Sequence, residues 1–302
     1  MSNHFRNYNN SDKQELVEQT YKKMYIEQTL EKKLNTKIYP ISDKKYKIID
    51  LLPLFDKIID DSDPDCNDGQ IVHLLQTYIS MKDKFNKNIN IKNLFTENEY
   101  NNLPIKIKKI FDEKINIQNL YPHIENWNFI YLISFLHDIG KIMLDKNFHN
   151  LPQHFSVGDI YPLGVPFSSS NIFYEKKWHE LNSEYQKYYH FDLFEPFCGF
   201  DKLPFTISHD YYLYKVLENT LIPKEGLYII RFHSFYAFHS PRNGKRGYTE
   251  YTSLNDWINL PLLKIFQKSD LYSKTRDIPK FEDYKNEIND LINSYCGDEL
   301  SW

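Results

Sequence analysis

Hydrophobic positions recur at helical spacing along most of the chain. Apolar residues three and four positions apart give one buried face to Asp12–Leu34, where Val17, Tyr21, Met24 and Tyr25 line up. Strand signals are poor, because no Asn-Gly turn separates two alternating runs of apolar and polar residues. The pattern predicts an all-α protein, a single helical bundle with no internal repeat and no linker.

The same spacing predicts further helices over Gln70–Thr77, Pro104–Ile115, Phe129–Leu136, Leu203–Leu217, Tyr228–Phe238, Leu260–Tyr272 and Phe281–Tyr295. Tyr46–Ile59 is also apolar, but Pro53 lacks a backbone N–H and predicts a break or a new start there. Ser11 and Gln14 match a capping box, which predicts that the first helix begins after Ser11.

Two segments are more polar than the rest. Met1–Asn10 is a polar arm, and Met81–Glu125 is rich in Lys and Asn with only short helical pieces. We interpret Met81–Glu125 as a surface insertion and not as a second domain. The whole chain, 1–302, is therefore expected to form one domain.

The most informative stretch is the end of the apolar run Phe129–Leu136. It stops abruptly at His137 and Asp138, and Asp is almost never buried unless it is paired or binds a metal. Gly140 removes a side chain at a point where another part of the chain must come close. The alternative is a simple helix end, with Gly140 and Lys141 as its stop signal.

Similar polar residues interrupt four other apolar helical stretches. The candidate metal ligands are His73, His137, Asp138, His209, His233 and Asp270. A lone buried His is more often a core residue than a ligand, but four imidazoles and two carboxylates together suffice for two metals that share one carboxylate. A ligand set without thiolate suits iron, manganese or zinc and does not separate them. His239 is the residue most easily mistaken for a ligand, because it follows His233 closely.

Composition narrows the class of protein. The chain has 41% hydrophobic and 16% aromatic residues, enough for a sizeable core. Its net charge is −4 with no strong basic block, so no nucleic-acid partner is expected. The three cysteines are far apart, which suits a reducing compartment. The sequence shows no signal-peptide core and no apolar run of about 18 residues, so we expect a cytoplasmic monomer without membrane contact.

The order His, His-Asp, Asp resembles the metal signature of the HD-domain superfamily. The chain resembles one branch of it far more closely, the myo-inositol oxygenases, from Phe5 to Trp302. The matching strings include Phe5–Tyr8, Asp60–Asp65, Leu136–Lys141, Val157–Asp159, Cys198–Asp201, Ser208–Tyr214, Ile230–Tyr236, Ser269–Lys274 and Leu300–Trp302. Their joint order and extent carry the resemblance, since no single string is specific enough.

The resemblance implies a non-haem di-iron oxygenase with an HD-domain-like fold. Such enzymes cleave the C1–C6 bond of myo-inositol with O₂, give D-glucuronate and water, and hold two iron ions in a mixed Fe(II)/Fe(III) state. By motif position, the ligands of one iron would be His73, His137, Asp138 and Asp270. The second iron would be held by His209, His233 and the other oxygen of Asp138.

The resemblance also implies a substrate site. Its residues by motif position are Arg6, Asp60, Asp63, Lys141, Gly158, Asp159, Ser234 and Lys274. A neutral polyol needs many hydrogen bonds from both donors and acceptors, which this mixture offers. Lys141 is the expected catalytic residue. Lysines beside a positively charged metal pair should have a lowered pKa, so that Lys141 or Lys274 can act as a base.

Some features leave other functions open. Met81–Glu125 is longer than the family's connection, and Pro241–Tyr251 also looks extended. An HD-type metal-dependent phosphohydrolase is the main alternative, with Arg231, Lys141 and Lys274 as phosphate-binding groups. A related di-iron oxygenase that acts on another polyol or a phosphonate is the second. A degenerate, non-catalytic relative is disfavoured because all six ligand positions are filled.

Overall fold

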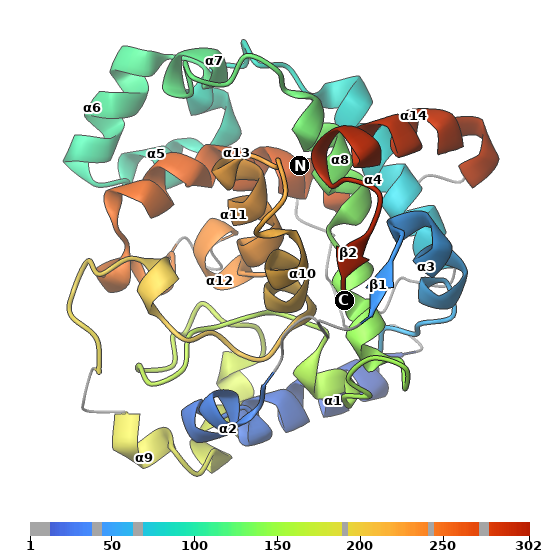
Figure 1. Ribbon diagram of the computed structural model, residues 1–302. Coiled ribbons are helices and arrows are strands. Elements are labelled where there is room, and N and C mark those ends of the chain that lie inside the picture. The colour runs from blue at the N-terminus through green and yellow to red at the C-terminus, as the bar shows by residue number, and fades with distance from the viewer. Residues whose placement is uncertain (1–12, 38–43, 63–68, 189–192, 241–244, 272–277) are drawn as a thin grey trace.

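The computed structural model describes residues 13–37, 44–62, 69–188, 193–240, 245–271 and 278–302. Within these ranges the regular elements are helices, apart from two short antiparallel strands, β1 (Lys45–Tyr46) and β2 (Leu300–Ser301) (Figure 1). The predicted all-α class is confirmed. None of the helices in the described ranges has the length and apolar character needed to cross a membrane.

Five helices form the centre of the bundle. They are α4 (Gln70–Lys84), α8 (Asn128–Leu136), α10 (His209–Leu217), α11 (Lys224–Phe232) and α13 (Leu254–Asp270). Helix α8 packs against α4, α11 and α13, and α10 packs against α11. Most side chains of α8 are apolar and buried, as expected for a helix surrounded by others.

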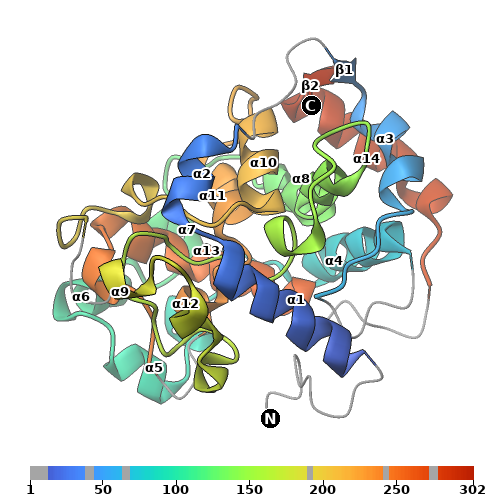
Figure 2. The same cartoon turned by 90° about the horizontal axis from the view of Figure 1, so that it is seen from below.

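Shorter and outer helices cover this centre. They are α1 (Gln14–Glu27), α2 (Leu30–Asn35), α3 (Ile48–Phe55), α9 (Tyr185–Tyr188), α12 (Tyr236–His239) and α14 (Phe281–Tyr295). Helix α1 runs across the face seen in Figure 2 and buries the predicted apolar stripe. The 3₁₀ helix η2 (Ile139–Leu144) continues the chain directly beyond α8.

The segment predicted as a surface insertion has a buried face of its own. It contains η1 (Ile91–Leu94), α5 (Glu97–Asn101), α6 (Ile105–Lys114) and α7 (Ile117–Leu120), which gather at one edge of the bundle beside α13 (Figure 1). Ile91, Ile107, Phe111 and Ile117 are buried in the same hydrophobic cluster as the central helices. The segment therefore packs onto the bundle and does not only cover its surface.

Two predicted boundaries near the N-terminus are wrong. The first helix has Lys13 at its N-cap and ends at Glu27, because the side chain of Gln28 bonds the carbonyls of His154 and Ile207 and Thr29 caps a new helix. Pro53 lies inside α3 without breaking it. The ring of Pro53 is exposed, so the backbone carbonyl that loses its partner can face water.

Two further predicted helix boundaries, both next to candidate ligands, are wrong. The helix predicted from Leu203 begins only at His209, because the preceding residues pair with the chain around Tyr161 and Leu163 and Ser208 then caps α10. The helix predicted over Tyr228–Phe238 ends at Phe232, and α12 begins at Tyr236. His209 and His233 therefore sit at helix ends.

Candidate metal centre

The turn after α8 places the first two candidate ligands. His137 is the C-cap residue directly after α8, and Asp138 precedes η2. A Cβ added to Gly140 would lie 2.3 Å from the backbone oxygen of His209. Only glycine allows so close an approach, which confirms the close contact expected at this position. The start of α10 is seated on this turn, so His209 lies beside Asp138.

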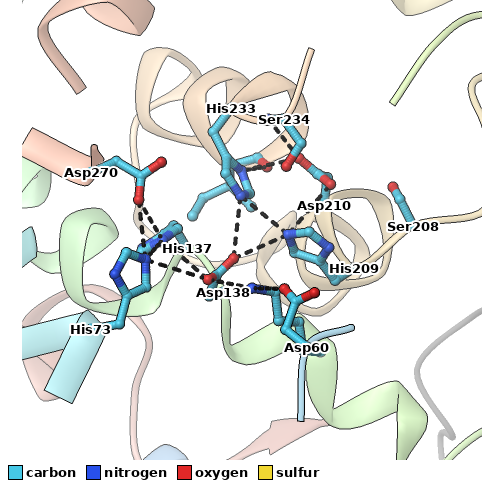
Figure 3. A network of polar contacts seen from close by, with 12 residues as sticks. Asp60, His73, His137, Asp138, Ser208, His209, Asp210, His233, Ser234 and Asp270 are labelled. Atoms are coloured by element: carbon cyan, nitrogen blue, oxygen red, sulfur yellow. Dashed lines mark hydrogen bonds and ion pairs between the residues drawn. The ribbon is translucent and has the colours of Figure 1, made fainter. Parts of the chain in front are cut away.

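Three of the candidate ligands form one group (Figure 3). The Nε2 atom of His73, from α4, lies 3.2 Å from the Nε2 of His137 and 3.1 Å from the Oδ1 of Asp270. His137 Nε2 lies 3.4 Å from the same oxygen. Asp270 is the last residue of α13, so three separate helices supply this group.

A second group lies on the other side of Asp138 (Figure 3). The Nε2 atoms of His209 and His233 are 3.2 Å apart. The Oδ1 of Asp138 lies 3.1 Å from the first of them and 3.6 Å from the second. The Oδ2 of Asp138 lies 3.6 Å from His73 Nε2 and 3.5 Å from His137 Nε2. One carboxylate therefore presents one oxygen to each group.

Backbone carbonyls hold three of the imidazoles in a single orientation. The Nδ1 atoms of His137, His209 and His233 lie 3.1, 2.6 and 2.9 Å from the carbonyl oxygens of Ser134, Ser156 and Ile230. A carbonyl only accepts, so each Nδ1 carries a proton and each Nε2 points into the centre. Ligand histidines are fixed in this way in metal sites.

The distances fit two bound metal ions. Metal–nitrogen bonds of about 2.0–2.1 Å at ordinary angles place neighbouring ligand atoms about 3 Å apart. The ring nitrogens and carboxylate oxygens of both groups are separated by about that distance, and ligand atoms within reach of one ion recur in three overlapping sets. The residues present therefore suit a pair of metal ions bridged by Asp138.

The electrostatics of the centre also favour cations. Burial raises the pKa of Asp138, but Lys141 and His137 reverse this and hold that pKa well below its usual range. Burial lowers the pKa of His137, yet the carboxylates of Asp138 and Asp270 raise it to about 10. Without a metal, a proton on His137 compensates part of the charge of the buried carboxylates. A metal ion would replace that proton, since ligand histidines must be neutral.

Lys141 lies between two carboxylates. Its Nζ is 2.6 Å from Asp138 Oδ2 and 2.8 Å from Asp60 Oδ2. Burial lowers the pKa of Lys141, but Asp138 and Asp60 raise it well above its usual range. A lowered pKa was expected for Lys141 from the sequence, because of the positive charge of nearby metal ions. The protein groups around this amine instead raise its pKa.

Some of the other predicted substrate residues are described by the structure, and the rest are not. Asp159 accepts a hydrogen bond of 2.7 Å from Tyr21, and Gly158 has a φ of +84°, which favours glycine. The Ile160 amide donates to the Ser234 carbonyl, which places Asp159 near Ser234. Arg6, Asp63 and Lys274 lie outside the described residues, and so does the predicted arm 1–10.

Sequence reasoning missed a buried carboxylate that lies beside the candidate ligands, Asp210. Asp210 is fully buried, and its Oδ1 lies 3.1 Å from His233 Nδ1 and accepts a hydrogen bond from the Ser234 amide. Its Oδ2 has no hydrogen-bond partner and lies 3.6 Å from His209 Nε2. The doublet His209-Asp210 repeats the doublet His137-Asp138, and this repetition was the available signal.

Comparison with known proteins shows which protein family the chain matches. A sequence profile of the family described as myo-inositol oxygenase matches residues 14–97 and 90–302. An inositol oxygenase of Dictyostelium discoideum is 34% identical, over 99% of this chain and 89% of that protein. Inositol oxygenases of Danio rerio and Homo sapiens are 32% and 28% identical, over 99% of this chain and 93% and 90% of those proteins.

Proposed function

The chain belongs to the myo-inositol oxygenase family, and we propose that it is a di-iron oxygenase that cleaves the C1–C6 bond of myo-inositol with O₂ to give D-glucuronate and water. The observation that carries this proposal is Asp138, whose two oxygens face two separate groups of imidazoles. One iron would be bound by His73, His137, Asp138 and Asp270. The other would be bound by His209, His233 and Asp138.

The iron pair would supply Lewis acidity toward substrate hydroxyls and the redox partner for O₂. Imidazole and carboxylate ligands suit iron in such sites. Everything else must come from the protein, which binds and orients the polyol, excludes water and controls protons. The site is suited to this, because His137, Asp138, His209 and His233 are each at most 5% exposed.

Lys141 is the proposed catalytic residue. In the metal-free chain its ammonium is held between Asp138 and Asp60 by hydrogen bonds, and both carboxylates favour the protonated form. A substrate hydroxyl that enters beside Asp60 would take over one of these hydrogen bonds. Lys141 would then hold a proton at Nζ next to the substrate oxygen whose charge develops, and this proton can move between the two.

The remaining substrate contacts combine acceptors with donors. Asp60 and Asp159 would accept hydrogen bonds from hydroxyls, and Lys141 and Ser234 would donate or accept them. Asp60 is held by bonds from the amide and hydroxyl of Ser62, so its carboxylate is already oriented. The family motifs add Arg6, Asp63, Gly158 and Lys274 to the proposed substrate site.

The phosphohydrolase alternative has less support. Arg231 pairs at 3.2 Å with Asp201, whose side chain is 58% exposed, and packs over the ring of Tyr214. The guanidinium of Arg231 is paired with Asp201, and Lys141 is paired with two carboxylates, so neither of these two predicted groups is free to bind a phosphate.

Anaerobic loading with Fe²⁺, followed by myo-inositol and O₂, tests the proposal against that alternative. The expected result is O₂ uptake with formation of glucuronate. Release of phosphate from a phosphomonoester, with no O₂ uptake and no glucuronate, would overturn the oxygenase proposal. Activity on another cyclic polyol, but not on myo-inositol, would overturn the assigned substrate alone.

A further inference from the structure

Two segments that are far apart in the sequence, 81–125 and 245–251, meet in the folded chain. Glu99, from α5 of the first segment, pairs with Arg246, from the second, and with Lys264 of α13. We call these three residues the Glu99 cluster. Lys264 Nζ lies 2.6 Å and Arg246 Nη2 3.1 Å from the same oxygen, Oε1 of Glu99. Helices α5 and α13 are neighbours at this edge of the bundle (Figure 1).

The cluster is buried, and further contacts hold its side chains in place. The side chains of Glu99, Arg246 and Lys264 are only 13%, 7% and 10% exposed. The second oxygen of Glu99 accepts a bond of 2.8 Å from the Thr96 amide in a capping box. Both cations also lie over the ring of Phe95. The first segment therefore supplies both the carboxylate and the aromatic surface that hold them.

The two cations depend on this one carboxylate. Burial lowers the pKa of Arg246 to about 10, and burial together with Arg246 lowers the pKa of Lys264 to about 8. In both cases Glu99 is the acidic group that opposes the shift. Removal of one partner from a buried ion pair leaves an uncompensated charge, which is strongly unfavourable. Loss of the Glu99 charge should therefore displace Arg246.

Arg246 connects the cluster to a candidate metal ligand. Its Nη1 donates a bond of 2.6 Å to the carbonyl of Phe238 in α12, and the adjacent Gly247 amide donates to the Ala237 carbonyl. The next residue of α12, His239, has its Nε2 2.7 Å from the backbone oxygen of His233. Arg246 thus fixes the short helix that in turn holds the backbone of His233.

His239 acts in this connection as a hydrogen-bond donor. It is fully buried, its Nε2 lies 2.7 Å from the carbonyl oxygen of His233, and its Nδ1 lies 3.1 Å from the hydroxyl of Ser240. The carbonyl of His233 can only accept, so Nε2 carries a proton. His239 is therefore no metal ligand but a support for one, as ligating residues commonly have.

We propose that Glu99 is a positioning residue for the metal ligand His233, and that it acts through Arg246, the carbonyl of Phe238 and His239. This inference rests on the proposed function, because it takes His233 as a ligand. It gives the segment 81–125 a role, because Glu99 supplies the carboxylate that fixes α12 next to His233.

Titration of the metal-free full chain with Co²⁺, followed by calorimetry and visible absorption, tests the proposal without turnover. The wild-type chain should bind two Co²⁺. Glu99→Gln should weaken one of the two binding steps about tenfold, the lower end of the effect of losing a partner of a ligand, and leave the other step within about twofold. Arg246→Lys keeps the positive charge but cannot reach Glu99 and Phe238 together, so it should weaken the same step.

Lys264→Met is the matched control. It removes the other cation of the cluster and leaves the pair of Glu99 and Arg246 in place, so both binding steps should stay close to wild type. Binding by Glu99→Gln and Arg246→Lys that equals wild type would overturn the inference, and so would an equal loss in Lys264→Met. If Glu99→Gln does not fold by circular dichroism, Arg246→Lys decides. Failure of the wild-type chain to bind two ions would instead contradict the proposed function.

Discussion

Gly140→Ala is the substitution that most directly separates the geometry of the centre from its chemistry, because it changes no ligand. The added Cβ would lie 2.3 Å from the backbone oxygen of His209 and 3.0 Å from the Cβ of Leu213. Carbon and oxygen atoms without a bond rarely approach closer than about 3.3 Å. The start of α10 must therefore move about 1 Å away from the turn that carries Asp138.

A shift of this size is large for a metal site. His209 Nε2 lies 3.1 Å from Asp138 Oδ1, and functional groups must be held within about 0.5 Å of their productive positions. We expect one of two metal-binding steps to weaken about 10–100-fold, as when the support of a ligand is lost. Overpacking should also lower the free energy of unfolding by about 1–3 kcal/mol.

Co²⁺ titration and thermal unfolding of the variant measure both effects. Gly297→Ala is the control, because Gly297 has a φ of +78° but no atom within 4 Å of an added Cβ. It should cost about 1 kcal/mol of stability through backbone strain alone and leave metal binding unchanged. Binding of two metals by Gly140→Ala with wild-type affinity would contradict the expected shift of α10. Loss of the same binding step in Gly297→Ala would contradict it as well.

Three further predictions concern individual groups of the centre. Asp210→Asn replaces the carboxylate whose Oδ2 faces His209 by an amide, and we expect it to weaken one metal-binding step about tenfold in a Co²⁺ titration. Unchanged binding would show that Asp210 has no part in metal binding. Asp60→Asn should raise the KM for myo-inositol about 10–100-fold, because a charged acceptor is lost, while metal content stays the same; a change in metal content alone would contradict a substrate role. The pKa of His137 is raised to about 10 in the metal-free fold, so the folded chain holds this proton more tightly than the unfolded chain. The resulting stabilisation is fully present below the ordinary histidine pKa of about 6.5 and is lost as the pH rises toward 10. Melting temperatures should show this decline without metal and not with bound Co²⁺, since the bound imidazole is neutral; equal pH profiles would contradict it.

The helical class could be predicted from the sequence because the apolar spacing is strong in the central helices. Helix α14 has the predicted bounds, and α8 and α6 differ from prediction by a residue or less at each end. The candidate ligands could also be chosen, because His and Asp inside apolar helices are costly unless something holds them. That reasoning selected Asp138 and the five other candidate ligands that the structure gathers near it.

The missed features depend on contacts between distant parts of the chain. The start of α10 is set by pairing of residues 204–206 with the chain near Tyr161, which no local pattern reveals. Asp210 was missed because its role comes from contacts with His233 and Ser234, which follow the end of another helix, α11. Glu99 meets its partners Arg246 and Lys264 only in the folded chain, because about 150 residues separate them in sequence.

The direct test of the central claim is electron paramagnetic resonance of the Fe²⁺-loaded chain after partial oxidation, before and after addition of myo-inositol. The account predicts the signal of a coupled Fe(II)/Fe(III) pair, with one unpaired spin for two irons, and a change of that signal when myo-inositol binds. An isolated Fe(III) signal from a single iron per chain, or a paired signal that myo-inositol leaves unchanged, would contradict a di-iron centre bridged by Asp138 that receives this substrate.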